Sequence, residues 1–256
     1  MNRRHTRRRL LTGASAVTLA GLAGCIATNR DVAETVEEHY DVEGASAVTA
    51  SAVNGDVTVT CEDRDDVAVT GVKVAASDGD LESVRLEASR EDGTLSLDVE
   101  VDGGLLRFGP DPKMDLEVAV PADLRVSRVE TTNGDLEVAE VDGETAVDTT
   151  NGDVTIDAVG GPLTVETTNG EVSAGGVSDD AAVETTNGAV DLSLSPDLEA
   201  TLSVSTTNGE ITVEGFDDET TRTDSDLEAT RGDGSHDLEV STTNGDVDVG
   251  VEETAG

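Results

Sequence analysis

Large aromatic side chains are almost absent from this sequence, which has one Tyr, two Phe and no Trp among its 256 residues. A wide globular core usually relies on aromatic side chains, because each of them buries a large apolar surface. The interior of this protein must instead be filled by Val, Leu, Ile, Ala and Thr. This composition favours a narrow, elongated core over a broad one.

Basic residues are scarce as well, since 16 Lys and Arg stand against 56 Asp and Glu and the formal net charge is -40. Charge-driven binding to nucleic acid or to anionic lipid needs clustered Lys and Arg, so this balance excludes both. The acids alternate with Val, Leu and Ile over most of the length, which indicates a folded chain and not a disordered one. In 1 M salt the Debye length is about 3 Å, and like charges no longer repel. We therefore infer a halophilic source.

Recognisable catalytic and metal-binding motifs are missing too. The sequence has no nucleophile elbow, phosphate-binding loop or dinucleotide fingerprint, and His5, His39 and His236 lack zinc-ligand spacing. Repeated Asn-Gly-Asp segments could supply oxygen ligands to calcium, but the Gly-Gly-x-Gly-x-Asp pattern of calcium-binding β-rolls is absent. We predict no enzymatic activity, no catalytic residues, no cofactor and no metal site, with only loose cation association.

Residues 1–24 have the layout of a signal peptide. They contain five Arg, no acid, and an apolar stretch that is too short to span a membrane. Within them, the segment 6–11 resembles the twin-arginine export motif, with Arg7 and Arg8 as the arginine pair and Leu10 where Phe is usual.

The signal peptide ends in Leu-Ala-Gly-Cys at 22–25, which resembles a lipobox. We predict that Cys25 carries a lipid, that residues 25–35 form a tether, and that the protein sits on the extracytoplasmic face of the cell membrane. The simpler alternative is an ordinary signal peptide in which Cys25 happens to lie near the cleavage site. Cys61 is then the only other thiol, and its alternation with neighbouring Val predicts a small buried hydrophobe and not a reactive group.

The dominant feature of the sequence is an internal repeat. Thr-Thr-Asn-Gly occurs six times, with spacings of 18, 18, 18, 21 and 36 residues between successive Asn. These repeat asparagines, which we predict to mark structural corners, are Asn133, Asn151, Asn169, Asn187, Asn208 and Asn244. The long last gap contains a degenerate copy at 223–227, and an earlier partial copy lies at 53–57.

Each repeat unit contains two short stretches in which Val or Thr alternates with polar residues, the pattern of half-buried strands. Asn-Gly predicts the corner between them, since both residues tolerate positive φ. An antiparallel meander would use each Asn-Gly as a hairpin turn, whereas a β-solenoid would stack each unit as one coil on the next. We favour an all-β, single-stranded β-helix (β-solenoid) with about 18 residues per coil, because stacked Asn side chains can hydrogen-bond along the column.

The repeat divides the body of the chain into two parts. We expect residues 129–252 to form the regular Thr-Thr-Asn-Gly solenoid, and residues 36–128 to form irregular N-terminal coils that cap it. The coil between Asn208 and Asn244 is expected to bulge as an acidic loop over 215–237 without breaking the stack. A weak pattern predicts a short helix over 31–39.

Two segments resemble a known family. The runs 114–121 (Met-Asp-Leu-Glu-Val-Ala-Val-Pro) and 129–136 (Val-Glu-Thr-Thr-Asn-Gly-Asp-Leu) resemble the DUF4097 β-strand-repeat family, which is described as candidate adhesins and is similar to the head GIN-domain proteins. The resemblance covers roughly residues 36 to 252. It implies a single-stranded β-helix and a cell-envelope role, and it carries over no catalytic residues. The strong acidity departs from typical members.

These observations predict a cell-surface lipoprotein that acts as a non-catalytic adhesion or structural binding module of the envelope. Its expected partners are the membrane, through Cys25, and a surface glycan, a surface-layer protein or another solenoid. Two alternatives stay open: a polysaccharide-acting β-helix enzyme, and an envelope sensor or scaffold that binds a membrane partner.

Overall fold

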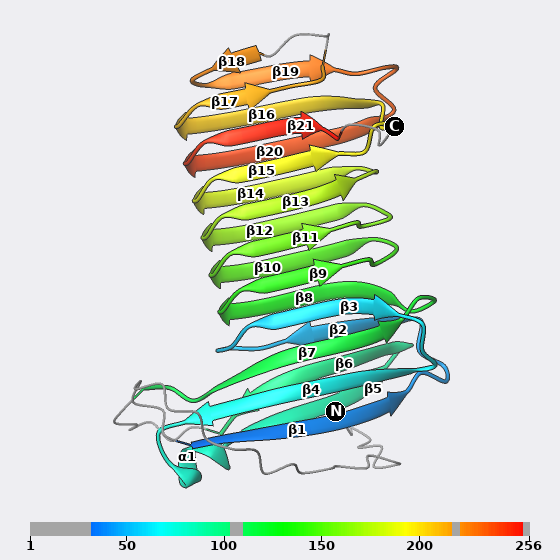
Figure 1. Cartoon of the computed structure of the whole chain (residues 1–256), viewed down its shortest axis with the longest axis vertical. Coiled ribbons are helices and arrows are strands. Elements are labelled where there is room, and N and C mark those ends of the chain that lie inside the picture. Colours follow the sequence, from blue (N-terminus) through cyan, green and yellow to red (C-terminus); the bar gives the residue numbers. More distant parts are fainter. Residues whose placement is uncertain (1–31, 103–109, 217–220, 253–256) are drawn as a thin grey trace, which may run out of the picture.

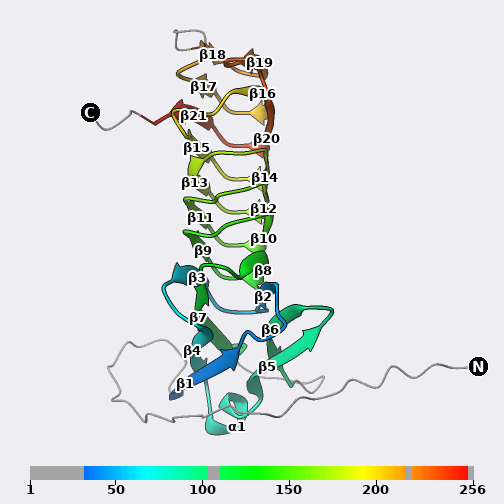
Figure 2. The same ribbon diagram turned by 90° about the vertical axis from the view of Figure 1, so that its right-hand side faces the viewer.

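The computed structural model describes residues 32–102, 110–216 and 221–252, which form a long rod of two facing β-sheets (Figures 1 and 2). The predicted signal peptide, Arg7, Arg8, Cys25 and most of the predicted tether lie outside the described residues. The one helix among the described residues is the short α1 (Asp78–Leu81). The fold is therefore all-β.

From β6 to β17 successive strands alternate between the two facing sheets (Figure 2). In spatial order, the eleven-stranded sheet consists of β1 (Val32–Asp41), β4 (Asp66–Ala75), β7 (Lys113–Pro121), β3 (Val57–Glu62), β9 (Leu136–Ala139), β11 (Val154–Asp157), β13 (Val172–Val177), β15 (Val190–Leu194), β21 (Val247–Val251), β17 (Ile211–Val213) and β18 (Thr221–Thr223). The ten-stranded sheet consists of β19 (Asp226–Thr230), β16 (Ala200–Asn208), β20 (His236–Asn244), β14 (Ala181–Asn187), β12 (Leu163–Asn169), β10 (Thr145–Asn151), β8 (Arg125–Asn133), β2 (Ala47–Ser51), β6 (Thr94–Val101) and β5 (Val84–Glu91).

Strict alternation of side chains explains the narrow core. In β12, Leu163, Val165 and Thr167 are buried, whereas Thr164 and Glu166 are exposed. Neighbouring strands repeat this pattern in register, so columns of Val and Leu from the two sheets meet along the axis of the rod. Val and Thr suit such a surface because they are stiff at χ1 and pack well on a pleat. Aliphatic side chains and inward-pointing threonines fill most of the space between the sheets.

Neighbouring strands in the middle of the rod run parallel, which decides between the two predicted architectures. Asn151 of β10 pairs with Asn169 of β12, and Asn169 pairs with Asn187 of β14. A meander would have paired antiparallel strands across each Asn-Gly turn. Stacked parallel coils are the arrangement of a β-solenoid, and the meander is excluded.

The repeat asparagines form one continuous ladder along the rod. Each donates its side-chain Nδ2–H to the Oδ1 of the asparagine in the coil below it, at 2.8 to 2.9 Å. The ladder begins at Asn54, which accepts from Asn133. Positive φ is confined to glycines and to Asp92, Glu140 and Ala158 among the described residues, so no Asn of the ladder adopts it. Asn is therefore favoured at the corner because its side-chain amide hydrogen-bonds along the ladder, and not because it tolerates a left-handed backbone conformation.

The expected order of the last coils is wrong. Asn187 does not pair with Asn208; it pairs with Asn244, which in turn pairs with Asn208. The C-terminal strands β20 and β21 therefore lie between the preceding coil, β14–β15, and the coil β16–β17 (Figure 1). We call β20–β21 the inserted coil.

The expected acidic loop over 215–237 is also replaced by other structure. β18 pairs antiparallel with β17, and β19 pairs antiparallel with β16, so both strands cap the upper end of the rod. The degenerate repeat copy at 223–227 lies where these two strands meet. The 21-residue spacing before Asn208 has three residues more than each of the three 18-residue spacings, and it spans the level at which the inserted coil lies.

The N-terminal end repeats this arrangement. β2 lies between β6 and β8, and β3 lies between β7 and β9, although β6 to β9 follow one another in the sequence. The strands β1, β4 and β5 run antiparallel to their neighbours and cap the lower end. The short helix predicted over 31–39 is wrong, because β1 already begins at Val32 and pairs with β4 along its whole length.

Candidate functional site: an acidic trough

An open trough of about 460 Å³ runs along the outer face of the ten-stranded sheet. Its two rims are columns of outward-pointing side chains, one acidic and one of threonines. We call this surface the acidic trough; its outward-facing side chains are Glu130, Thr132, Asp148, Thr150, Glu166, Thr168, Glu184 and Thr186. Four successive strands, β8, β10, β12 and β14, contribute one acid and one threonine each. At about 4.8 Å per strand, the acids span roughly 14 Å.

The Thr-Thr pair of each repeat explains how the trough is built. The first threonine of the pair points inward and is buried, and the second lies exposed on the trough. Thr149 and Thr185, both first threonines, donate their Oγ1–H groups to the carbonyls of Gly134 and Gly170 at 3.3 Å. The first threonine of every Thr-Thr-Asn-Gly repeat except Thr167 thus closes its corner on the inside, and the second threonines form a row of exposed hydroxyls on the outside.

Within the described residues, ion pairs compensate the charge of the acidic rim only at its lower end. Arg128 makes ion pairs of 2.9 Å with both Glu130 and Asp148. Burial raises the pKa of the Asp148 carboxyl, the nearby Glu166 and Glu130 raise it further, and Arg128 opposes them. The ionised form of Asp148 thus costs folding stability, which protonation would relieve. Glu166 and Glu184 continue the rim in register.

The acids that follow Asn-Gly have a different role. Asp135 accepts a hydrogen bond from the backbone N–H of Asp153 at 2.9 Å, and Asp153 accepts one from Glu171 at 2.8 Å. Each carboxylate therefore ties its corner to the next coil. We assign these residues to the scaffold and not to a binding surface.

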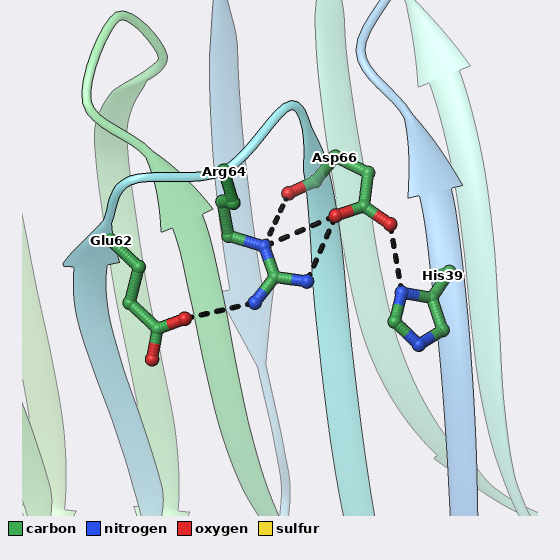
Figure 3. A network of polar contacts seen from close by, with 4 residues as sticks. All are labelled: His39, Glu62, Arg64 and Asp66. Atoms are coloured by element: carbon green, nitrogen blue, oxygen red, sulfur yellow. Dashed lines mark hydrogen bonds and ion pairs between the residues drawn. The ribbon is translucent and has the colours of Figure 1, made fainter.

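A second polar network lies at the lower end of the rod (Figure 3). Asp66 binds His39 through a 2.8 Å contact and Arg64 through contacts of 2.8 and 3.2 Å, while Arg64 also reaches Glu62 at 3.0 Å. The hydrogen bond from Arg64, followed by that from His39, lowers the pKa of Asp66. This network joins β1 to the turn between β3 and β4, which is a structural role.

Cys61 packs at the edge of the core and is half-buried. Burial raises the pKa of its thiol, and Asp142 and Glu140 raise it further. A thiol with a raised pKa is a poor nucleophile at neutral pH. The predicted role of Cys61 as a small hydrophobe therefore agrees with its surroundings, although it is less buried than expected.

One cluster of possible metal ligands was not predicted from the sequence. Asp179, Asp180 and His236 each offer a ligand atom, and these atoms lie within 4.8 Å of one another. The sequence pattern placed His236 in the acidic loop expected over 215–237. Only the insertion of β20 beside β14 brings it to Asp180, so no spacing in the sequence pointed to this cluster.

Comparison with known proteins gives one family. The family model described as Toastrack DUF4097 matches residues 34–250, and no curated protein matches the chain.

Several solved structures are similar over most of their length. A candidate cell adhesion protein from Clostridium sporogenes is 12% identical, with a TM-score of 0.42, and the match covers 86% of this chain and 100% of that one. A candidate adhesin from Bacteroides fragilis is 14% identical with a TM-score of 0.44, covering 85% and 97%. A candidate lipid-binding protein from Parabacteroides distasonis is 11% identical with a TM-score of 0.40, covering 86% and 97%. Likenesses this distant do not indicate what this chain binds.

A search of the described residues for membrane-spanning helices found none of sufficient length and apolarity.

Proposed function

This chain belongs to the Toastrack DUF4097 family, and we propose that it is a non-catalytic binding module, displayed at the cell surface on a lipid anchor at Cys25, whose acidic trough holds a surface glycan. In this proposal the body is a β-solenoid rod with about 18 residues per coil where the chain stacks consecutively. The observation that carries the proposal is the row of threonine hydroxyls beside a row of carboxylates on one regular face.

Hydroxyl and carboxylate groups at a fixed repeat suit a linear polymer of sugars. Carboxylates accept hydrogen bonds, and threonine hydroxyls both donate and accept, so together they match the hydroxyl groups of a glycan. The trough is open along its length and spans roughly 14 Å between its first and fourth strands, so an extended chain could lie in it without threading. The lining consists of Asp, Glu and Thr side chains with one Ala, groups that can hold a glycan through hydrogen bonds.

Removing one hydroxyl from the trough should weaken glycan binding. We expect Thr168→Val to lower the affinity for the bound glycan by about three- to tenfold, the value of one hydrogen bond. Valine has nearly the same volume and suits a strand, so the fold should persist. Affinity would be measured by isothermal titration with the best ligand from a glycan array screened in molar salt.

The matched control for this variant is Thr155→Val. Thr155 is exposed on β11, on the outer face of the opposite sheet, so its loss should leave the affinity unchanged. Equal losses in both variants, or an array on which no glycan is retained, would contradict the trough as a glycan site.

The anchor is tested separately. If Cys25 carries the lipid, Cys25→Ser should move nearly all of the protein from the membrane fraction to the medium, because the apolar anchor is the only strong membrane attachment predicted by the sequence. Replacing Arg7 and Arg8 by Lys should instead keep the precursor inside the cell. The measurement is immunoblotting of membrane, medium and cytosol fractions. A Cys25→Ser protein that stays in the membrane fraction would refute the lipobox interpretation.

A further inference from the structure

Three ligating side chains meet where the inserted coil contacts the coil below it. Asp179 and Asp180 lie in the loop between β13 and β14, and His236 is the first residue of β20. The Nδ1 atom of His236 is 3.3 Å from Oδ1 of Asp179 and 3.4 Å from Oδ1 of Asp180. The side chains are 33% to 56% exposed, so an ion can reach them from solvent.

These distances fit shared coordination better than a direct ion pair. The His39–Asp66 pair at the other end of the rod has a length of 2.8 Å, whereas both contacts of His236 are longer. Ligand atoms around a tetrahedral zinc ion, with bonds of roughly 2.0–2.2 Å, stand about 3.4 Å apart. Both distances from His236 match that spacing, and all three ligand atoms lie within 4.8 Å of one another, so they could share one ion with water as a further ligand.

We propose that Asp179, Asp180 and His236 bind one divalent transition-metal ion of the zinc type, which clasps the inserted coil to the rest of the rod. An imidazole ligand favours zinc and its neighbours over calcium or magnesium, which take oxygen ligands alone. The strongly acidic surface raises the local concentration of any cation, and the imidazole supplies the selectivity.

Backbone hydrogen bonds hold both carboxylates in place. Oδ1 of Asp179 accepts from the N–H of Asp180 at 2.8 Å, and Oδ1 of Asp180 accepts from the N–H of Asp237 at 3.0 Å. Each oxygen has a second lone pair for a metal ion. Such outer contacts orient ligands before the ion arrives and normally strengthen binding.

The cluster belongs to this level of the rod and not to the repeat. In the coils below, the positions that align with Asp179 and Asp180 are occupied by Gly161–Pro162 and by Gly143–Glu144. The histidine comes from β20, one of the two strands of the inserted coil, which return to lie between earlier coils. An ion bound here would oppose local unfolding of β20, because a ligand that binds only the folded arrangement stabilises that arrangement.

The test is zinc titration of the purified full chain, with ZnCl₂ as the probe, in molar NaCl and millimolar CaCl₂ so that the general acidic surface is screened and occupied. We expect one zinc ion per chain by calorimetry. His236→Gln and Asp179→Asn should each weaken its affinity at least about tenfold. The side-chain amide introduced by Asp179→Asn could still accept the hydrogen bond from the N–H of Asp180, so this variant should fold.

His39→Gln is the matched control, because His39 contacts a single carboxylate, and it should keep the full affinity for zinc. Hydrogen exchange supplies the second measurement, in which zinc should slow exchange of the β20 amides in the wild-type chain and not in Asp179→Asn. The absence of saturable binding, or equal binding by His236→Gln, would overturn the site. Zinc binding that leaves β20 exchange unchanged would overturn the clasp.

Discussion

Replacing Gly170 by Ala is expected to prevent folding or to lower the free energy of unfolding by more than about 4 kcal/mol, an exceptional cost for one methyl group. An added Cβ would lie 1.8 Å from the carbonyl oxygen of Gly152 and 2.6 Å from its carbonyl carbon. Separating the two coils would break the hydrogen bond from the N–H of Gly152 to the carbonyl of Asn169 at 3.0 Å. Every glycine of the Thr-Thr-Asn-Gly repeats meets a carbonyl oxygen at 2.0 Å or less in the same way.

Thermal unfolding followed by circular dichroism measures this effect. For a domain of this size, about 4 kcal/mol corresponds to a fall in Tm of roughly 8–16 °C. Gly250→Ala is the control, because Gly250 lies in strand β21 and a methyl group added there would meet no heavy atom within 4 Å. We expect its stability to change by less than about 1 kcal/mol. A Gly170→Ala protein as stable as the control would refute the close stacking of the corners.

Lowering the salt concentration is expected to unfold the domain, with loss of the β circular-dichroism signal below a few tenths molar and recovery at about 2 M. Glu166 lies in register between Asp148 and Glu184, so it faces a like charge on both sides. Two unit charges at about 5 Å repel by about 1 kcal/mol in water, and by several times more near a protein surface. A domain's total stability is only about 5–15 kcal/mol, so a few such contacts decide whether it folds.

Glu166→Gln should therefore move the unfolding midpoint to lower salt, with a gain of about 1–2 kcal/mol in dilute buffer that fades at 2 M. Glu137→Gln is the matched control, since Glu137 lies between Thr58 and Thr155 on the outer face of the other sheet. Its removal should leave the midpoint nearly unchanged. A domain that is equally stable in dilute buffer would count against the halophilic source, and equal shifts in both variants would count against repulsion along the rim.

The repeat determined the parts of the fold that depend on local pattern. Alternation of Val and Thr with acids specified strands. The near absence of aromatics specified a narrow core, because Ala, Val, Thr, Leu and Ile side chains fill only a thin layer between two sheets. The regular spacing of Asn133, Asn151, Asn169 and Asn187 placed their side chains in one column, since identical amides at a regular rise bond to one another. The family could also be identified from the sequence, on the same repeated residues.

The tertiary structure alone decided the order of the terminal coils. Asn208 of β16 and Asn244 of β20 belong to the same Thr-Thr-Asn-Gly motif, and the two strands bury the same pattern of side chains. The local sequence pattern therefore does not determine which of the two strands lies beside β14. Their order depends on long-range pairing: β18 and β19 pair antiparallel at the upper end of the rod, and the inserted coil lies between β14–β15 and β16–β17. The cluster of Asp179, Asp180 and His236 is a consequence of that choice. No periodicity in the sequence could have indicated it, because it joins residues 57 apart across an insertion.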